Sequence, residues 1–266
     1  MQVNSLKNKL NIRYFLYEIV HHCNLDCKCC DHCSPLAEPE FVNLKHYKKD
    51  LEKLKKTINI INSIGIMGGE PLLHPDFLEI VKITRKVLKY TVIFIYTNGI
   101  CLQNKDTKFW QTLSKEKANI IITKYNLNIN YSELEITARQ HGVYISYENR
   151  NKQKDEFNKI KFDINGDMDI EYSHSHCFHA EHCATLENGV LYKCPIVPAA
   201  RHFNKYFNKN LSVVEEDGID LYKKHSNEEI LSYFKNPIPF CRYCDIRERD
   251  KMIKWEISKK NIQEWT

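Results

Sequence analysis

Five of the chain's eleven cysteines lie in one stretch, which runs from His22 to Cys33 and reads HCNLDCKCCDHC. Three of them, Cys23, Cys27 and Cys30, have the spacing C-x3-C-x2-C. Three thiolates on one short loop can bind three irons of a 4Fe-4S cluster and leave the fourth iron open. A structural zinc ion could use the same thiolates, with Cys33 or a neighbouring histidine as its fourth ligand. The spacing alone therefore leaves two kinds of metal site open.

A regular alternation of strand and helix patterns surrounds this stretch. An aromatic and β-branched run from Tyr14 to Val20 predicts a strand that leads directly into the cysteine loop. From Asn43, a residue suited to an N-cap, apolar residues recur at helical spacing. Further strands are predicted at 64–67, 91–97, 120–123 and 143–147, with helices at 75–88, 106–113 and 131–140. Such alternation implies a parallel sheet with right-handed crossovers.

The number of units limits the architecture. Five or six strand-helix units cannot close an eight-stranded barrel, so the expected fold is α/β, an open partial (β/α)6-type barrel over residues 1–150. Residues 151–266 are expected to form a small hairpin-rich domain. Asn-Gly pairs predict hairpins over 160–172 and 186–191, and helices are expected over 227–234 and 247–260.

Composition and charge exclude several classes of protein. A hydrophobic content of 42% and a charged content of 27% are ordinary for a globular protein. The N-terminus has no secretory signal, and no apolar run is long enough to span a bilayer. The net charge is +5, with lysines interspersed among acidic residues, which argues against a nucleic-acid surface. We therefore predict a cytoplasmic protein with no membrane or nucleic-acid partner, in which cysteines stay reduced.

Two further motifs lie where predicted strands end. Gly68-Gly69-Glu70-Pro71 follows the strand at 64–67, and Thr97-Asn98-Gly99 ends the strand at 91–97. Two adjacent glycines allow another group to approach the backbone closely. Together with the cysteine spacing, these motifs resemble those of the radical S-adenosylmethionine (SAM) enzymes, and the resemblance covers about residues 14–150.

The resemblance implies specific site residues. Cys23, Cys27 and Cys30 would hold a 4Fe-4S cluster whose open iron binds SAM. The cofactor SAM would contact residues of the two strand-end motifs, namely Gly68, Gly69, Glu70, Thr97 and Asn98. In the family, the residue before the third cysteine is often aromatic and lies near adenine, but here it is Cys29. We expect Cys29 to have a packing role, and Cys33 has no assigned role.

The resemblance also implies a reaction. Reduction of the cluster, by a protein such as flavodoxin or ferredoxin, leads to cleavage of SAM into methionine and a 5'-deoxyadenosyl radical. That radical abstracts a hydrogen atom from an unactivated carbon of the substrate. The protein's own contribution is to orient the reactants and to exclude water.

A second group of cysteines lies in the C-terminal part: Cys177, Cys183, Cys194, Cys241 and Cys244. From the residues alone, a zinc ribbon is an alternative. Their order, however, resembles the twitch domain of radical SAM dehydrogenases, a shortened relative of the SPASM domain. The resemblance implies a second, auxiliary 4Fe-4S cluster on Cys177, Cys194, Cys241 and Cys244.

Cys183 then remains unassigned. It could replace Cys177 as a ligand, or be a small buried apolar residue, as free cysteines commonly are. It could also donate a hydrogen atom to a substrate radical, as in radical SAM epimerases. The sequence leaves these three roles open.

Three functions follow from these patterns. The first is a radical SAM oxidoreductase that oxidises an alcohol of a small polar molecule, a carbohydrate or aminocyclitol. The second is an epimerase of a sugar or peptide residue with Cys183 as hydrogen donor; only 22 residues precede Cys23, which favours a small-molecule substrate. The third is a zinc-stabilised binding module without catalysis. Candidate substrate contacts at strand ends are Lys124, Tyr125, Glu148, Arg150 and Arg201.

Overall fold

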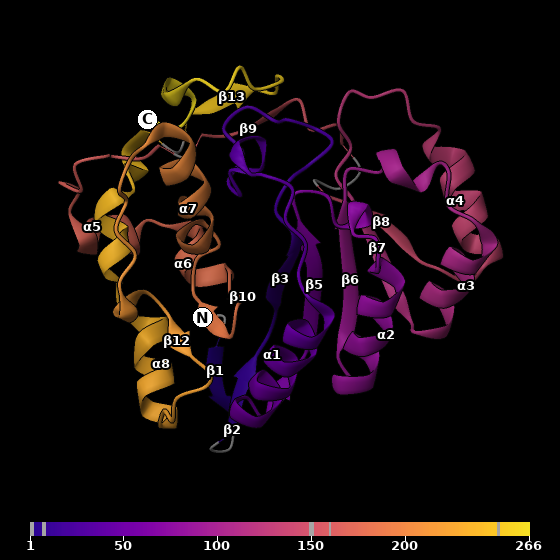
Figure 1. The fold of residues 1–266 in the computed structure, drawn as a ribbon, viewed down its shortest axis with the longest axis horizontal. Coiled ribbons are helices and arrows are strands. Elements are labelled where there is room, and N and C mark those ends of the chain that lie inside the picture. The colour runs from indigo at the N-terminus through magenta and orange to yellow at the C-terminus, as the bar shows by residue number, and fades with distance from the viewer. Residues whose placement is uncertain (1–2, 7–8, 149–151, 160, 249–250) are drawn as a thin grey trace.

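The structure is a computed structural model and describes residues 3–6, 9–148, 152–159, 161–248 and 251–266. Its main feature is an eight-stranded sheet (Figure 1). In spatial order its strands are β12 (Ile219–Asp220), β11 (Val190–Tyr192), β10 (Thr185–Glu187), β3 (Phe15–Val20), β5 (Ser63–Gly68), β6 (Val92–Thr97), β7 (Ala118–Ile122) and β8 (Ile145–Tyr147). The strands from β10 to β8 are parallel to their neighbours, whereas β10–β11 and β11–β12 are antiparallel.

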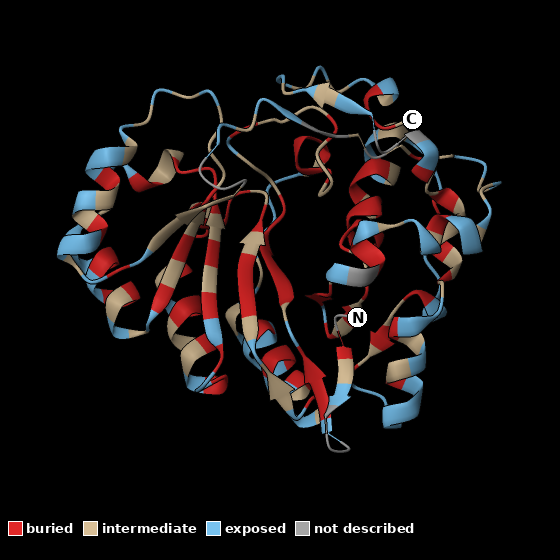
Figure 2. Ribbon diagram, turned by 180° about the vertical axis from the view of Figure 1, so that it is seen from behind, coloured by how far each residue is buried: buried red, intermediate tan, exposed pale blue. Residues whose placement is uncertain are grey.

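Helices cover one face of this sheet. They are α1 (Leu44–Thr57), α2 (Phe77–Val87), α3 (Thr107–Lys115) and α4 (Tyr131–Gln140). The side chain of Asn43 caps α1 by accepting hydrogen bonds from two backbone N–H groups, as its sequence position predicts. Figure 2 shows buried residues concentrated on the central strands and on the helix faces that meet them. The predicted open α/β partial barrel is confirmed.

The sheet has an outer face toward these helices and an inner face away from them. Tyr17 of β3 packs against Tyr47 of α1, with ring centroids 4.6 Å apart, so it belongs to the outer face. Because strand side chains alternate, Leu16 and Glu18 lie on the inner face. A Cβ placed on Gly65 would lie 2.6 Å from the Tyr14 hydroxyl and 2.8 Å from Leu16. Tyr14 is therefore on the inner side as well.

The remaining elements lie at the start of the chain and after the core. Strands β1 (Val3–Leu6), β2 (Lys9–Ile12) and β4 (Ile60–Ile61) form a small sheet, and β9 (Glu156–Asn158) pairs with β13 (Met252–Lys254). The C-terminal part adds helices α5 (Ile170–Ser175), α6 (Phe178–His182), α7 (Ile196–Phe207) and α8 (Asn227–Lys235). Short 3₁₀ helices occupy Ser34–Leu36, Pro71–Leu73, Ile100–Leu102, Glu215–Asp217, Pro239–Tyr243, Ile246–Glu248 and Ile262–Glu264. No helix among the described residues is both long and apolar enough to span a membrane.

One of the two predicted hairpins is wrong. Residues 161–172 form a loop followed by the start of α5, and residue 160 lies outside the described residues. The Asp163 carboxylate accepts from the backbone N–H groups of Asn165 and Asp167, and Asp169 caps α5. These aspartates stabilise a turn and a helix start in place of a strand pair. The hairpin around Asn188 and Gly189 is confirmed as β10–β11, with both residues at positive φ.

The predicted C-terminal helix over 247–260 is also wrong. Arg247 and Glu248 end a 3₁₀ helix, residues 249–250 lie outside the described residues, and residues 251–260 form no helix and include β13. The apolar residues Ile253, Trp255 and Ile257 alternate with polar ones, and that period of two is typical of an extended chain. Helix α7, in contrast, is an element that the sequence analysis did not predict.

A buried carboxylate joins the C-terminal hairpin to the core. Asp50 of α1 accepts hydrogen bonds from the Tyr17 hydroxyl at 2.7 Å, the Tyr222 hydroxyl at 2.7 Å and the backbone N–H of Gly189 at 2.9 Å. Strand β10 itself pairs in parallel with β3. Residues on both sides of position 150 therefore contribute to one sheet.

We expect Asp50→Ala to lower the free energy of unfolding by about 2–4 kcal/mol, because it leaves buried donors without an acceptor. Denaturant unfolding of the two proteins would measure the difference. Glu52→Ala, on the exposed face of the same helix, is the matched control and should change stability by no more than about 0.5 kcal/mol. Equal losses in the two variants would contradict the role assigned to Asp50.

Candidate functional site

The cysteine loop begins directly after β3, at the carboxyl end of the parallel strands. Cys23, Cys27 and Cys30 are partly exposed, whereas Cys29 and Cys33 are buried. The three partly exposed thiols lie near enough to one another that their charges interact. Burial, together with the neighbouring Cys27 thiolate, raises the pKa of Cys30 to about 12. The loop thus separates three available sulfurs from two that pack inside.

Each of the two packed cysteines has a defined environment. The Cys29 thiol donates to the backbone carbonyl of Glu264 at 2.7 Å, and Cys33 is fully buried in the core cluster of the C-terminal part. Both have positive φ, 57° and 50°. The expected packing role of Cys29 agrees with these contacts, and Cys33 has a packing role too.

Cys27 receives a hydrogen bond at its sulfur and has a tyrosine hydroxyl nearby. The Trp255 indole N–H donates to it at 3.2 Å, and the Tyr125 hydroxyl lies near enough to the same sulfur to counter the rise in the pKa of Cys27 that burial causes. An isolated antiparallel bridge links Cys27 to Ile257. Tyr125, expected from the sequence to contact substrate, thus lies against the cysteine loop. Trp255 was not predicted as a site residue, because 228 positions separate it from Cys27 and no local motif marks it.

The two glycines of the GGE motif pack against the cysteine loop itself. A Cβ on Gly68 would lie 2.0 Å from the Val20 carbonyl oxygen, and one on Gly69 would lie 2.1 Å from the His22 carbonyl oxygen. The φ of Gly68 is also 140°, in the region that favours glycine. The resemblance to the radical SAM enzymes predicts that these glycines contact a bound ligand. In the structure, the group that approaches their backbone is the chain leading into Cys23.

Glu70 joins the two strand-end motifs. Its buried carboxylate accepts from the Thr97 hydroxyl at 2.9 Å and from the backbone N–H of Asn98 at 2.9 Å and of Leu72 at 3.0 Å. Burial raises the pKa of Glu70 to about 7, although these donors act in the opposite direction. The Asn98 amide in turn donates to the Asn24 side chain at 2.8 Å, beside Cys23. The three predicted motifs are therefore brought together at one edge of the sheet.

Glu18, a buried carboxylate on the inner face of β3, contacts histidines at both ends of the cysteine loop. Glu18 lies 2.8 Å from His32, measured from Oε1 to Nδ1, and 3.7 Å from Nδ1 of His21. Burial alone would raise the pKa of Glu18, but the two histidines lower it below its usual range. Burial alone would lower the pKa values of His21 and His32, but Glu18 raises both. A lone carboxylate in the otherwise apolar Phe15–Val20 strand is the sequence signal that could have revealed this contact.

More charged groups continue along the inner face from β10 to α7. Glu187 lies 2.9 Å from Arg201, measured from Oε1 to the guanidinium nitrogen, and Arg201 also pairs with Glu40 at 3.2 Å. The His202 ring lies 5.0 Å from that of His21, and burial lowers the pKa of His202 to about 4. The buried Nε2 atom of His202 has no protein hydrogen-bond partner within the described residues. Glu187, Arg201 and His202 thus form a polar cluster next to the cysteine loop, on the inner face of the sheet.

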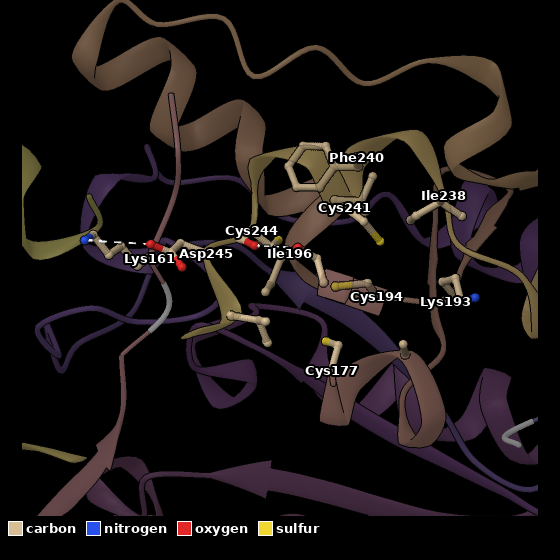
Figure 3. A pocket seen from close by; sticks show the side chains of 14 residues that line it. Lys161, Cys177, Lys193, Cys194, Ile196, Ile238, Phe240, Cys241, Cys244 and Asp245 are labelled. Carbon is tan, nitrogen blue, oxygen red and sulfur yellow. Dashed lines mark hydrogen bonds and ion pairs between the residues drawn. The ribbon is translucent and has the colours of Figure 1, made fainter. Parts of the chain in front are cut away.

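Four of the five C-terminal cysteines line a single pocket (Figure 3). They are Cys177, at the start of α6; Cys194, after β11; and Cys241 and Cys244, in and after the 3₁₀ helix Pro239–Tyr243. Burial, and then the charge of Cys177, raises the pKa of Cys194 well above its usual value. Over the described part of the chain, no three His, Cys, Asp or Glu side chains converge tightly enough to hold one metal ion.

Cys183 does not line this pocket. It lies two residues before Thr185, whose register partner is Leu16 on the inner face, so the same alternation places it on that face. Its charge would raise the pKa of both the Tyr14 and the Tyr96 hydroxyls, which places it near this inner-face pair.

The other candidate substrate contacts have different surroundings. The Lys124 ammonium lies 4.2 Å from the centre of the Tyr147 ring. Glu148 accepts from the Thr123 hydroxyl at 2.7 Å. Arg150 lies outside the described residues.

Comparison with known proteins identifies the family. The model of the radical SAM superfamily matches residues 17–153, which include the cysteine loop and both strand-end motifs. The chain belongs to the radical SAM superfamily. It is therefore a radical SAM enzyme, and the hypothesis of a zinc-stabilised module is not retained.

Curated radical SAM relatives align with only part of this chain. It is 31% identical over 91 residues to 7,8-dihydro-6-hydroxymethylpterin dimethyltransferase of Methanocaldococcus jannaschii, which covers 33% of this chain and 17% of that protein. It is 28% identical over 99 residues to GTP 3',8-cyclase of Syntrophomonas wolfei, and this alignment covers 35% of this chain and 29% of that protein. With the subtilosin biosynthesis protein AlbA of Bacillus subtilis it shares 27% over 117 residues, covering 42% and 24%. The chain thus spans less than a third of each of these relatives.

Two solved structures resemble the whole fold. BtrN in complex with AdoMet and 2-DOIA has a TM-score of 0.54 at 15% identity, covering 90% of this chain and 98% of that one. The structure of anSMEcpe with bound AdoMet has a TM-score of 0.52 at 13% identity, covering 94% and 95%. At such low identity, these likenesses show the shared fold and nothing more specific.

Membership of the radical SAM superfamily implies a 4Fe-4S cluster and SAM. The cysteine loop fits such a cluster by its donor set, because its three partly exposed thiols lie together at the carboxyl edge of the sheet. Polar atoms at that edge, such as the Asn98 amide, are of the kind that a ligand with amino and carboxylate groups requires.

The ion pairs of Glu18 give the radical SAM fold a pH-dependent component of stability. The lowered pKa of Glu18 stabilises the fold above about pH 4.3, the pKa of a glutamate in the unfolded chain. The raised pKa values of His21 and His32 stabilise it below about pH 6.5, the pKa of a histidine in the unfolded chain. We expect Glu18→Gln to lower the unfolding free energy of the cluster-free chain by about 2 kcal/mol between these pH values. The difference should shrink as pH rises and the histidines lose their protons. Denaturant unfolding at several pH values measures it, and a pH-independent difference would contradict the assignment.

Proposed function

We propose that this radical SAM enzyme is an oxidoreductase that oxidises an alcohol group of a small polar molecule, a carbohydrate or an aminocyclitol. In this proposal Cys23, Cys27 and Cys30 hold the SAM-binding cluster. The backbone of Gly68, Gly69 and Glu70, with Thr97 and Asn98, forms the SAM site. The hydrogen bonds that connect these three motifs support the assignment.

The observation that carries the oxidoreductase proposal is the second cysteine set. Cys177, Cys194, Cys241 and Cys244 come from three separate segments and line one pocket. Four thiolates are a complete ligand set for a 4Fe-4S cube, which leaves no open iron for substrate. We assign to residues 151–266 a twitch-like role, in which this auxiliary cluster accepts an electron.

Oxidation of an alcohol to a carbonyl accounts for such an acceptor. The carbon loses one hydrogen atom to the 5'-deoxyadenosyl radical that the cluster and SAM supply when bound. The hydroxyl then loses a proton, and the remaining unpaired electron must leave the substrate. An auxiliary cluster near the inner face can take that electron, so the C–O bond becomes a C=O bond.

The polar groups on the inner face are suited to hold such a substrate. Glu187 and Arg201 offer an acceptor and donors for hydroxyl or amino groups. The imidazole of His202 is neutral near neutral pH, because burial lowers its pKa, and its Nε2 can bond to a hydroxyl. We assign these three side chains to substrate binding.

A specific observation also supports epimerisation as a second candidate. Cys183 lies near Tyr14 and Tyr96 on the inner face. A thiol there could return a hydrogen atom to a substrate radical from the side opposite to SAM. No electron acceptor is needed in this case, but the thiol becomes a thiyl radical, and the external electron donor must supply one electron, with a proton from solvent, to restore it.

The distinguishing experiment uses anaerobically reconstituted protein with SAM, a low-potential reductant and alcohols deuterated at the carbinol carbon. Oxidation predicts deuterium in 5'-deoxyadenosine and a carbonyl product. Epimerisation predicts an inverted alcohol that carries solvent hydrogen, and its loss in Cys183→Ala. SAM cleavage with neither product from any carbohydrate or aminocyclitol would contradict the proposed substrate class.

The proposal includes partners and a compartment. The enzyme needs an external electron donor such as flavodoxin or ferredoxin, and its other partner is the small-molecule substrate. We place it in the cytoplasm, where thiols stay reduced.

A further inference from the structure

The C-terminal segment, Met252–Thr266, lies along the cysteine loop although the two are far apart in sequence (Figure 1). The backbone N–H of Lys28 donates to Glu256 at 2.9 Å, and that of Ser258 donates to Asp26 at 2.7 Å. The Trp265 indole N–H donates to the Cys30 carbonyl at 3.2 Å. Hydrogen bonds from backbone and side-chain atoms therefore hold this segment against the loop from Asp26 to Cys30.

Within this contact, one hydrogen bond ends on the sulfur of Cys27. Trp255 donates its indole N–H to Cys27 Sγ at 3.2 Å. The Tyr125 hydroxyl lies near the same sulfur and counters the rise in the pKa of Cys27 on burial, and the Tyr125 and Trp255 rings lie 5.3 Å apart. Pairing of β13 with β9, and a bond from the Trp255 backbone N–H to the Asp155 carbonyl at 2.7 Å, hold the indole in place. An indole N–H and a hydroxyl from different parts of the fold thus lie at one thiol.

A hydrogen bond to a cluster sulfur stabilises the more negative oxidation state. Hydrogen bonds to ligand sulfurs are among the factors that set the potential of an iron-sulfur cluster. One-electron reduction adds one negative charge, part of which is carried by the cysteine sulfurs. A donor aimed at such a sulfur binds it more strongly after reduction, because bonds to charged acceptors are stronger.

We propose that Trp255 and Tyr125 are positioning residues that raise the reduction potential of the SAM-binding cluster, Trp255 through its hydrogen bond to Cys27 and Tyr125 through the hydroxyl dipole beside the same sulfur. The inference rests on the proposed function, in which Cys27 is a cluster ligand. One electron enters from an external low-potential donor, which is oxidised by one electron, and no bond forms or breaks in that step. The two residues make this reduction easier and leave the later chemistry to the groups at the sheet edge.

The test is an anaerobic redox titration of the reconstituted full-length enzyme with dithionite, followed by electron paramagnetic resonance. The cluster observed is the one whose signal changes when SAM is added, which separates it from the auxiliary cluster. Trp255→Phe keeps an aromatic ring beside Tyr125 and removes only the indole donor. Tyr125→Phe removes only the hydroxyl.

We expect each variant to have a more negative midpoint potential, by roughly a tenfold change in the reduction equilibrium, about 59 mV for one electron. The double variant should show a larger shift than either. Trp265→Phe is the matched control, because its indole N–H ends on a carbonyl oxygen; its potential should equal that of the unmodified enzyme.

The outcomes separate this inference from the proposed function. If the unmodified enzyme forms no SAM-responsive cluster, the proposed function fails. If that cluster forms and neither Trp255→Phe nor Tyr125→Phe shifts its potential, only the role of these two residues fails. Should Trp255→Phe not retain its cluster, the potential of Tyr125→Phe decides, and an unshifted value overturns the proposal.

Discussion

A variant with Cys23, Cys27 and Cys30 all changed to alanine is expected to produce no detectable 5'-deoxyadenosine and to lose one of two clusters. These thiols are the available sulfurs of the loop after β3, and removing them leaves the first cluster without protein ligands. The iron content after anaerobic reconstitution should fall from about eight to about four atoms per chain, the number in one cube. Iron and sulfide analysis, with chromatography of the SAM products, measures both effects.

The control for this variant lies in the same loop. Cys29 is buried and donates its thiol to the Glu264 carbonyl, so Cys29→Ala removes a cysteine without removing one of the available sulfurs. It should retain both clusters and cleave SAM. A triple variant that still holds two clusters would show that the ligands lie elsewhere. Loss of a cluster in Cys29→Ala would show that Cys29 is a ligand and that the assignment of Cys23, Cys27 and Cys30 is wrong.

The core of the fold was predictable because its signals are local. Strand and helix patterns alternate from Tyr14 onward, Asn43 caps α1 as expected, and the helix predicted from residue 106 is α3, with Asp106 as its N-cap. Parallel strands place their carboxyl ends at one edge, so the cysteine loop, Glu70 and Thr97 were expected to meet there. The structure brings them together through hydrogen bonds that the sequence does not specify.

The C-terminal part was less predictable, because its structure depends on contacts that are distant in sequence. The Asn165-Gly166 pair has the sequence of a hairpin turn, but Asp163 and Asp169 stabilise a loop and the start of α5 instead. Segment Met252–Lys254 is a strand because β9 is available to pair with it. The role of Trp255 follows from that pairing, so no local pattern could have revealed it.

For Gly68 and Gly69, the sequence predicted a close approach to the backbone but did not identify the approaching group. Two adjacent glycines predicted a close approach to the backbone, and the structure has one. The approaching group, however, is the chain from Val20 to Cys23, which passes over Gly68 and Gly69. These glycines therefore position the cysteine loop, and any effect on SAM includes that positioning.

The second large effect concerns the proposed auxiliary cluster, for which the sequence left Cys177 and Cys183 as alternative ligands. The structure places Cys177 in the pocket with Cys194, Cys241 and Cys244, and places Cys183 on the inner face near Tyr14. We expect Cys177→Ala to lose the auxiliary cluster, so that iron falls from about eight to about four atoms per chain. SAM cleavage should continue in this variant, whereas oxidation of the substrate should stop, because its electron acceptor is missing.

Cys183→Ala is the matched variant, since it removes a cysteine of the same region that does not line the pocket. It should keep both clusters and the full iron content. If Cys183→Ala loses a cluster and Cys177→Ala keeps both, then Cys183 is the ligand of the auxiliary cluster and Cys177 is not. If both variants keep two clusters but Cys183→Ala alone stops product formation, the thiol acts on the substrate, and epimerisation becomes the better description of the reaction.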